Sequence, residues 1–261
     1  MTQKLSNFFQ IQHAVNLEPT ARWVRVKMNG ETVADSKNAL LFLDWNINFP
    51  TYFFPRDDVN MELLHSTASS DGLKNNFVHW SVQSDNEIAK NGAWGFSKPP
   101  QGMEALQDYI TFRWEKPLSW HVEEEEMFIH ARDPHKRIDV LASSRHIEVK
   151  VAGETIADTH KPHLLFETFL PTRYYIPQED VHMDLLQASA TRSGCAYKGF
   201  ANYYSVKGKN QLVEDIVWFY QDPNPEYFKI EGLLCFYNEK VDIIVDGELE
   251  PRPISPFSEG I

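Results

Sequence analysis

The chain has 261 residues, enough for one large domain or two ordinary ones, and it can bury a sizeable core without metals or disulfides. Its 37 acidic and 25 basic residues give a formal net charge of −12, which disfavours nucleic acid or an anionic membrane as partner. Aromatic residues make up 13% of the chain, and the composition is that of an ordered globular protein.

The beginning of the chain lacks the long apolar run of a signal peptide. No stretch approaches the run of about 18 apolar residues that a membrane span needs. Only two cysteines occur, Cys195 and Cys235, so neither a disulfide framework nor a four-thiolate zinc site can be built. These features predict a cytoplasmic protein.

The first predicted element is a hairpin that occurs twice. Residues 25–35, RVKMNGETVAD, return at 148–158 as EVKVAGETIAD, a shift of 123 positions (158 − 35). Alternating residues around Asn29-Gly30 and Ala152-Gly153 are typical of two antiparallel strands joined by a tight turn. We therefore interpret the chain as two diverged copies of one β-rich module.

A strand that ends at a proline comes next in both copies. Residues 52–64, YFFPRDDVNMELL, match residues 174–186, YYIPQEDVHMDLL. Pro55 and Pro177 are expected to end the strand, and the acidic residues behind them to cap a one-turn helix.

Three short aromatic matches follow at a shift of 124 positions (204 − 80). They pair Trp80–Val82 with Tyr204–Val206, Trp94–Phe96 with Trp218–Tyr220, and Phe112 with Phe236. The shift between matched segments therefore changes slightly along the chain. Because strands must keep their inward alternation whereas loops tolerate insertions, we place these small insertions in loops.

The segment between the copies, residues 131–146, is neither rich in Gly and Ser nor a block of like charges. We expect an ordered crossover that packs against both modules. The predicted fold is mainly β, with a first module at 20–130 and a second at 147–250. The segment Pro251–Phe257 is expected to fray or to drape over the surface.

Several motifs, taken in order, resemble domain-of-unknown-function family 427 in a tandem two-copy form. They are the repeated hairpin, YYIP at 174–177, VHMDLL at 181–186, CAYKG at 195–199, YSV at 204–206 and HARDPHKRID at 130–139. The resemblance implies two tandem β-tent modules of antiparallel sheet with short helical turns and without bound metal. The family also carries a nucleotidyltransferase-like label, but the sequence has no Gly-rich phosphate loop and no paired aspartates in a Gly-Ser context.

The CAYKG segment differs between the copies. At a shift of 124 the second copy has Cys195, Tyr197, Lys198 and Gly199 where the first has Asp71, Leu73, Lys74 and Asn75. Only the lysine is kept, so a function of this segment would belong to the second module.

Lys198, between Tyr197 and Gly199, is the first candidate for catalysis, with Tyr197 as its partner. A lysine beside a phenol can take part in proton transfer or hold an anionic group of a substrate, and the glycine lets a ligand approach the backbone. The alternative is a turn whose tyrosine packs and whose lysine is solvated.

His79 is the third catalytic candidate, at the position that Tyr203 takes in the second copy. A histidine beside aromatic residues can act as a general base next to an apolar wall, or it can face solvent.

The predicted substrate-binding residues are aromatic or basic. The aromatic ones could equally belong to the core, and the basic ones, which stand in the crossover, could clamp a carboxylate or phosphate or form salt bridges with neighbouring aspartates. The set is Trp80, Trp94, Tyr204, Trp218, Arg132, His135 and Arg137.

A metal site is not expected, although ten histidines occur. His160 lies close to His163 in the sequence, and His130 close to His135, but neither pair has cysteine or carboxylate partners at a recognised metal spacing. We predict neither a metal nor a cofactor.

Two hypotheses about function follow. The first is a cofactor-independent enzyme of isomerase, cyclase or hydrolase type, which transforms a small, partly apolar molecule by acid/base chemistry in an aromatic-lined cleft. The second is a non-enzymatic ligand-binding or protein-interaction scaffold. Polar groups that converge in one module would favour the first, and similar surfaces on both would favour the second. The expected partner is a small molecule, neither nucleic acid nor membrane, and a homodimer stays open.

Overall fold

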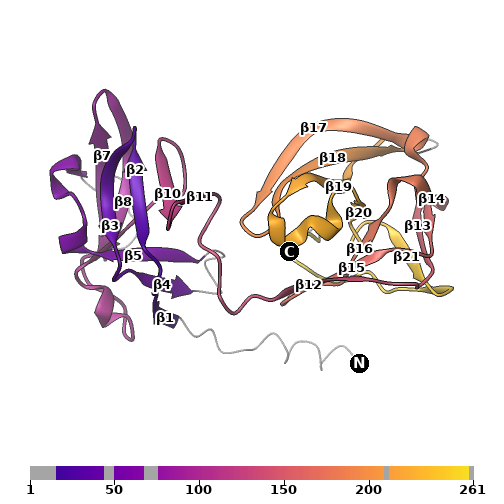
Figure 1. Ribbon diagram of the computed structural model, residues 1–261, viewed down its shortest axis with the longest axis horizontal. Helices are drawn as coiled ribbons and strands as arrows, with labels where there is room; N and C mark the ends of the chain where they lie inside the picture. Colours follow the sequence, from indigo (N-terminus) through magenta and orange to yellow (C-terminus); the bar gives the residue numbers. More distant parts are fainter. Residues whose placement is uncertain (1–15, 44–49, 68–75, 209–211, 259–261) are drawn as a thin grey trace. The chain divides into compact units, whose positions relative to one another are not determined.

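The computed structural model describes residues 16–43, 50–67, 76–208 and 212–258, which form two compact units divided between Asp133 and Pro134 (Figure 1). Each unit holds one seven-stranded and one four-stranded antiparallel sheet, and the described helical segments are short 3-10 turns. This confirms the prediction of a mainly β chain with two tandem β-tent modules. None of the described helical segments is long and apolar enough to cross a membrane.

The first unit encloses its core between its two sheets. In sheet order, the strands of the large sheet are β1 (Asn16–Pro19), β4 (Leu40–Leu43), β5 (Thr51–Pro55), β9 (Tyr109–Phe112), β8 (Glu87–Phe96), β7 (Phe77–Ser84) and β6 (Leu64–Thr67). Those of the small sheet are β11 (Glu125–Met127), β10 (Leu118–Val122), β2 (Val24–Met28) and β3 (Glu31–Ser36).

The second unit repeats this arrangement strand by strand. Its large sheet runs β12 (Ile138–Ala142), β15 (His163–Glu167), β16 (Arg173–Ile176), β20 (Leu234–Phe236), β19 (Leu212–Pro223), β18 (Gly199–Lys207) and β17 (Leu186–Cys195). Its small sheet runs β14 (Glu154–Thr159), β13 (Ile147–Val151), β21 (Asp242–Val245) and β22 (Glu248–Leu249). The segment predicted as a crossover contains β12, which pairs with β15 at the edge of the large sheet, where β1 lies in the first unit.

The predicted hairpins are confirmed as β2–β3 and β13–β14. Both turn residues have left-handed backbones, with φ of 52° and 82° at Asn29 and Gly30, and 49° and 80° at Ala152 and Gly153. Two consecutive left-handed residues match the twist of the flanking strands, which explains an Asn or Ala followed by Gly in both copies.

The capping role predicted for the acidic residues behind the prolines is wrong. Two 3-10 turns follow each strand, η1 (Arg56–Asp58) and η2 (Met61–Leu63) in the first unit, and η4 (Gln178–Asp180) and η5 (Met183–Leu185) in the second. Asp58 accepts a hydrogen bond from Ser36 Oγ at 2.6 Å, and Asp180 accepts one from Thr159 Oγ1 at 2.6 Å. The carboxylates therefore bind the hydroxyl at the end of each hairpin, that of Ser36 or Thr159. No side chain caps η1 or η4.

Each large sheet has an inner face, which packs on the small sheet, and an outer face with its own apolar cluster. The inner cores contain Phe54 and Trp120 in the first unit and Ile147 and Phe236 in the second. A 3-10 segment contributes a buried residue to each outer cluster, Leu106 from η3 (Glu104–Leu106) and Ile230 from η6 (Pro225–Ile230). Successive residues of a strand point to opposite faces, so the register decides which side chains can meet.

Candidate functional site

The outer faces of the two large sheets differ in chemistry. In the first unit this face carries Phe53, Phe96 and Thr51, and the residues at the same positions in the second are Tyr175, Tyr220 and Arg173. The second unit therefore has hydroxyl groups and charges where the first is apolar or uncharged.

Three charged side chains, Lys136, Glu167 and Lys198, form what we call the lysine cluster on the outer face of the second unit. Lys198 Nζ lies 2.5 Å from one carboxylate oxygen of Glu167, and Lys136 Nζ lies 2.9 Å from the other. The side chains of Lys198, Lys136 and Glu167 are 11%, 24% and 5% exposed. Because two ammonium groups share one carboxylate, the lysine cluster has an excess positive charge.

Lys198 is held in place by the turn that joins β17 to β18. Asn224 anchors this turn, since its backbone N–H donates to the carbonyl of Lys198 at 3.1 Å and its side chain donates to the carbonyl of Tyr197 at 2.6 Å. Gly199 has a φ of 100°, a conformation that favours glycine. Tyr197 is buried with its ring 5.6 Å from the ammonium of Lys136. The turn is thus buried, and the alternative of a solvated lysine does not hold.

The charges of the lysine cluster set the protonation of Glu167. Burial alone would raise the pKa of this carboxyl, but attraction and hydrogen bonds from Lys198 and Lys136 outweigh burial and hold the pKa below its usual range. An ammonium has three N–H donors. Within the part of the chain that the structure describes, Lys198 Nζ donates to Glu167 and has no second acceptor. The nearly buried ammonium of Lys198 therefore has N–H groups left that can donate hydrogen bonds to an oxygen atom of a ligand.

Two buried phenols, Tyr175 and Tyr220, lie on the same face as the lysine cluster. Burial raises the pKa of Tyr175 and of Tyr220 well above the usual range, and the charge of Glu167 adds to the rise in both. Both phenols stay protonated at neutral pH. The Tyr175 hydroxyl accepts a hydrogen bond from Trp218 Nε1 at 3.2 Å.

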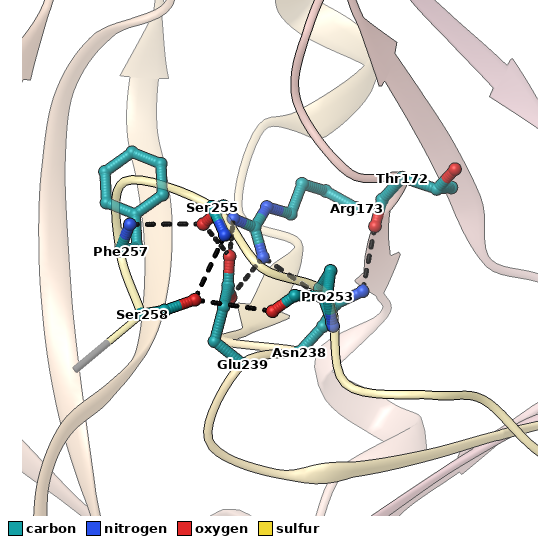
Figure 2. A network of polar contacts seen from close by, with 8 residues as sticks. All are labelled: Thr172, Arg173, Asn238, Glu239, Pro253, Ser255, Phe257 and Ser258. Carbon is teal, nitrogen blue, oxygen red and sulfur yellow. Dashed lines mark hydrogen bonds and ion pairs between the residues drawn. The ribbon is translucent and has the colours of Figure 1, made fainter. Parts of the chain in front are cut away.

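A second group, the arginine cluster, consists of Arg173, Asn238 and Glu239 (Figure 2). The guanidinium of Arg173 donates to both carboxylate oxygens of Glu239 at 2.7 Å and to Asn238 Oδ1 at 3.2 Å. The side chains of Arg173 and Glu239 are 7% and 1% exposed. The rings of Trp218 and Tyr237 flank the guanidinium, at 5.4 Å and 6.0 Å from its carbon.

The predicted catalytic residues are divided between the units. Tyr197 and Lys198 lie in the second unit, whereas His79 lies on β7 of the first, opposite Trp94 on β8. His79 Nδ1 is buried and has no hydrogen-bond partner among the described residues, so no described carboxylate orients this ring. Catalysis by these residues stays a prediction.

The four predicted aromatic residues do not line one cleft. Trp80 packs against the inner core, and Tyr204, also on the inner side, stacks on Phe219 with ring centroids 5.1 Å apart. Trp94 and Trp218 point to the outer faces instead, because they pair in register with the residue that precedes Trp80 or Tyr204. Of the four, Trp218 lies beside a charged cluster.

Of the predicted basic residues of the crossover, Arg137 makes a contact outside the lysine cluster. Arg137 Nε pairs with Asp139 at 2.7 Å in an ion pair whose side chains are 81% and 39% exposed. His135 is exposed and Arg132 is partly buried in the first unit.

The sequence reasoning missed Lys136, Glu167 and Arg173. A signal for Arg173 was present, since the repeat replaces Thr51 by an arginine on a strand otherwise rich in aromatic residues. The first-copy counterparts of the CAYKG segment, Asp71, Leu73, Lys74 and Asn75, lie outside the described residues.

Two further observations bear on ligands. A hollow of about 110 Å³ adjoins the arginine cluster, where Thr172, Tyr174 and Asn238 face Pro251 and Pro253. In residues 16–43, 50–67, 76–208 and 212–258, no group of three or more His, Cys, Asp or Glu side chains could hold a metal ion.

A family model described as a domain of unknown function (DUF427) matches the chain twice, over residues 16–125 and 139–247. The first match lies within the first unit and the second within the second. No curated protein matches the chain.

Proposed function

We propose, for a chain that belongs to the DUF427 family through both of its units, that the second unit binds a small, partly apolar molecule and transforms it by acid/base chemistry. The reaction would be of isomerase, cyclase or hydrolase type. The observation that carries the proposal is the lysine cluster, in which the nearly buried ammonium of Lys198 and the partly exposed ammonium of Lys136 share one carboxylate. The molecule bears a carboxylate or carbonyl oxygen that accepts hydrogen bonds from Lys198 and Lys136.

The environment of the lysine cluster supports binding of such an oxygen. Charged donors form the stronger class of hydrogen bond, and a site largely removed from water strengthens them further. The apolar part of the molecule would lie against aromatic side chains of the same face, such as Tyr220.

The same groups support a chemical step. Negative charge that develops on the bound oxygen, in an enolate or a tetrahedral intermediate, is stabilised by the two ammonium groups. Tyr220, which stays protonated because burial raises its pKa, can donate a further hydrogen bond or a proton.

Ligand binding without conversion is the second candidate. The lowered pKa of Glu167 favours it, because a carboxylate that is ionised far below neutral pH is a weak base. In either case the proposal includes a cytoplasmic protein without a cofactor, whose partner is a small molecule and neither nucleic acid nor membrane. A homodimer stays open beside a monomer.

A screen against small carboxylates and ketones, read by thermal shift and by mass spectrometry, tests the proposal. Lys198→Met is compared with Lys207→Met, because Lys207 is exposed on β18 and its ammonium donates to the backbone carbonyl of Asp184. We expect a ligand that stabilises the unmodified chain and Lys207→Met, and that stabilises Lys198→Met far less.

Mass spectrometry separates the two candidates. A changed mass that depends on Lys198 supports the enzyme, and an unchanged ligand supports the binding protein. A ligand that stabilises Lys198→Met as much as the unmodified chain would place the site elsewhere and overturn both.

A further inference from the structure

Residues 251–258, which we call the strap, follow β22 and lie across the arginine cluster without joining a sheet (Figure 2). The end of the strap folds on itself, since the Phe257 N–H donates to Ser255 Oγ at 3.1 Å and the Ser258 N–H donates to the Ser255 carbonyl at 3.0 Å. Three prolines occur in the strap, PRPISPFS. They restrict φ and lower the entropy that the segment loses when it is held in one conformation.

Two side chains of the strap contact the arginine cluster and its rings. Ser255, which is 6% exposed, donates its hydroxyl hydrogen to the Glu239 carboxylate. The Phe257 ring centre lies 5.6 Å from the Arg173 guanidinium and 6.0 Å from the Tyr237 ring. A hydroxyl and an aromatic ring, two residues apart, are therefore what the strap presents to this surface.

The rest of the strap is loosely attached. Ile254 is 81% exposed, and the ion pair between Arg252 and Asp242 is 54% and 40% exposed, which makes its net contribution small. The hollow of about 110 Å³ lies beside Pro251 and Pro253, so the strap is not close-packed on the unit along this stretch.

The surface beneath the strap satisfies its own charges. Arg173 and Glu239 hold each other through two hydrogen bonds, and Asn238 binds both Arg173 and the carbonyl of Thr172. Removal of Ser255 would therefore leave no unpaired buried charge, and we expect the arginine cluster to keep these hydrogen bonds when the strap leaves.

The first unit has an apolar contact at the position that corresponds to Ser255. Ala131 stands at the position of Ser255, at a shift of 124 (255 − 131). It is 1% exposed, belongs to the inner core cluster and donates its backbone N–H to the carbonyl of Pro50 at 3.2 Å. In the second unit a hydrogen bond from Ser255 replaces this apolar contact with the core. The strap therefore contacts the surface of its unit through side chains, as a bound peptide does.

We infer that the arginine cluster, with Trp218 and Tyr237, is a peptide-binding site that the strap fills in cis. Its ligands are proline-containing segments that carry a hydroxyl residue two positions before an aromatic residue. Proline-rich peptides bind at aromatic surfaces with little loss of conformational entropy. The inference does not depend on the lysine cluster or on the function proposed for it.

A labelled peptide of the sequence of residues 250–258 tests this site by fluorescence anisotropy. The peptide is titrated into the full chain and into a chain shortened after Leu249. Because the strap competes in cis, we expect at least about tenfold tighter binding to the shortened chain. Peptides with Ser255→Ala or Phe257→Ala should bind about tenfold more weakly, and the control peptide with Ile254→Ala should bind like the original. Equal affinity for both chains, or equal loss with all three peptides, would overturn the inference.

Hydrogen exchange in the full chain covers the case in which the shortened chain does not fold. In the variant with Ser255→Ala and Phe257→Ala, the amides of the strap should exchange at least about tenfold faster, while those of β16 and β20 keep their protection. Loss of protection in β16 and β20 together with the strap would show that the strap is an integral part of the fold and would contradict a bound peptide.

Discussion

Lys198 and Glu167 form an ion pair across 31 positions of the sequence, with side chains that are 11% and 5% exposed. Removal of one partner from such a buried pair is strongly destabilising, because the other charge then stays buried without water and without a counter-ion. The stability of the second unit should therefore depend on this pair far more than on exposed pairs.

Replacement of Glu167 tests that dependence. Glu167→Gln leaves two ammonium groups side by side without their anion, and we expect the free energy of unfolding in urea to fall by about 3 kcal/mol. The control is Glu179→Gln, since Glu179 pairs with Lys161 at 3.1 Å in an exposed pair that water and salt screen, and it should leave the same free energy almost unchanged. Equal effects of the two variants would contradict the buried pair.

Acid should remove the contribution of Glu167. Its pKa is lowered in the folded chain, as is that of Glu239, which Arg173 and Ser255 hydrogen-bond despite burial. The unfolded state then binds more protons than the folded state between the lowered pKa and the ordinary value of about 4.3. The contribution is complete above that ordinary value and is lost as the pH falls through the folded pKa. In urea unfolding between pH 7 and pH 3, the free energy of unfolding of Glu167→Gln should fall less with acid than that of the unmodified chain. The same fall in both would contradict the lowered pKa of Glu167.

The two cysteines should differ in reactivity. Cys235 is fully buried, and burial raises the pKa of its thiol to about 12, whereas Cys195 is partly exposed. Since the thiolate is the reactive form, a thiol reagent at pH 8 should modify Cys195 in the folded chain and Cys235 after unfolding. Modification of both at one rate in the folded chain would contradict this difference.

Replacement of His79 tests which of the two units carries the activity. Its buried Nδ1 has no hydrogen-bond partner in the described part of the chain, so His79→Phe removes an unsatisfied polar atom and should leave stability unchanged or slightly raised. If the lysine cluster is the site, His79→Phe should also keep ligand binding and any conversion. Loss of conversion with intact folding, measured by mass spectrometry and circular dichroism, would instead support the catalytic role predicted from the sequence.

The repeat is what made the fold predictable. The match between residues 25–35 and 148–158 identified the hairpins and the number of modules, because a turn of two left-handed residues leaves a clear trace in both copies. The acidic residues behind Pro55 and Pro177 were misread because a hydroxyl distant in the sequence, from Ser36 or Thr159, binds them instead of a helix end.

The candidate site was less predictable. Lys198 was identified from its segment, but its partner Glu167 stands on another strand, and nothing local distinguishes this glutamate from a solvated one. The aromatic residues were grouped by type, whereas their faces follow from strand register, which placed Trp80 and Trp94 on opposite sides of one sheet. Long-range pairing and register are properties of the folded chain.

The most direct test of the central claim is calorimetric titration of the ligand found in the screen against Lys136→Met, Lys198→Met and Lys207→Met. Each lysine of the lysine cluster would donate a charge-assisted hydrogen bond worth about 1.5–3 kcal/mol, which corresponds to a loss of affinity of about tenfold or more. We expect such a loss for Lys136→Met and for Lys198→Met, with Lys207→Met binding like the unmodified chain. The same dissociation constant in all three variants would contradict it.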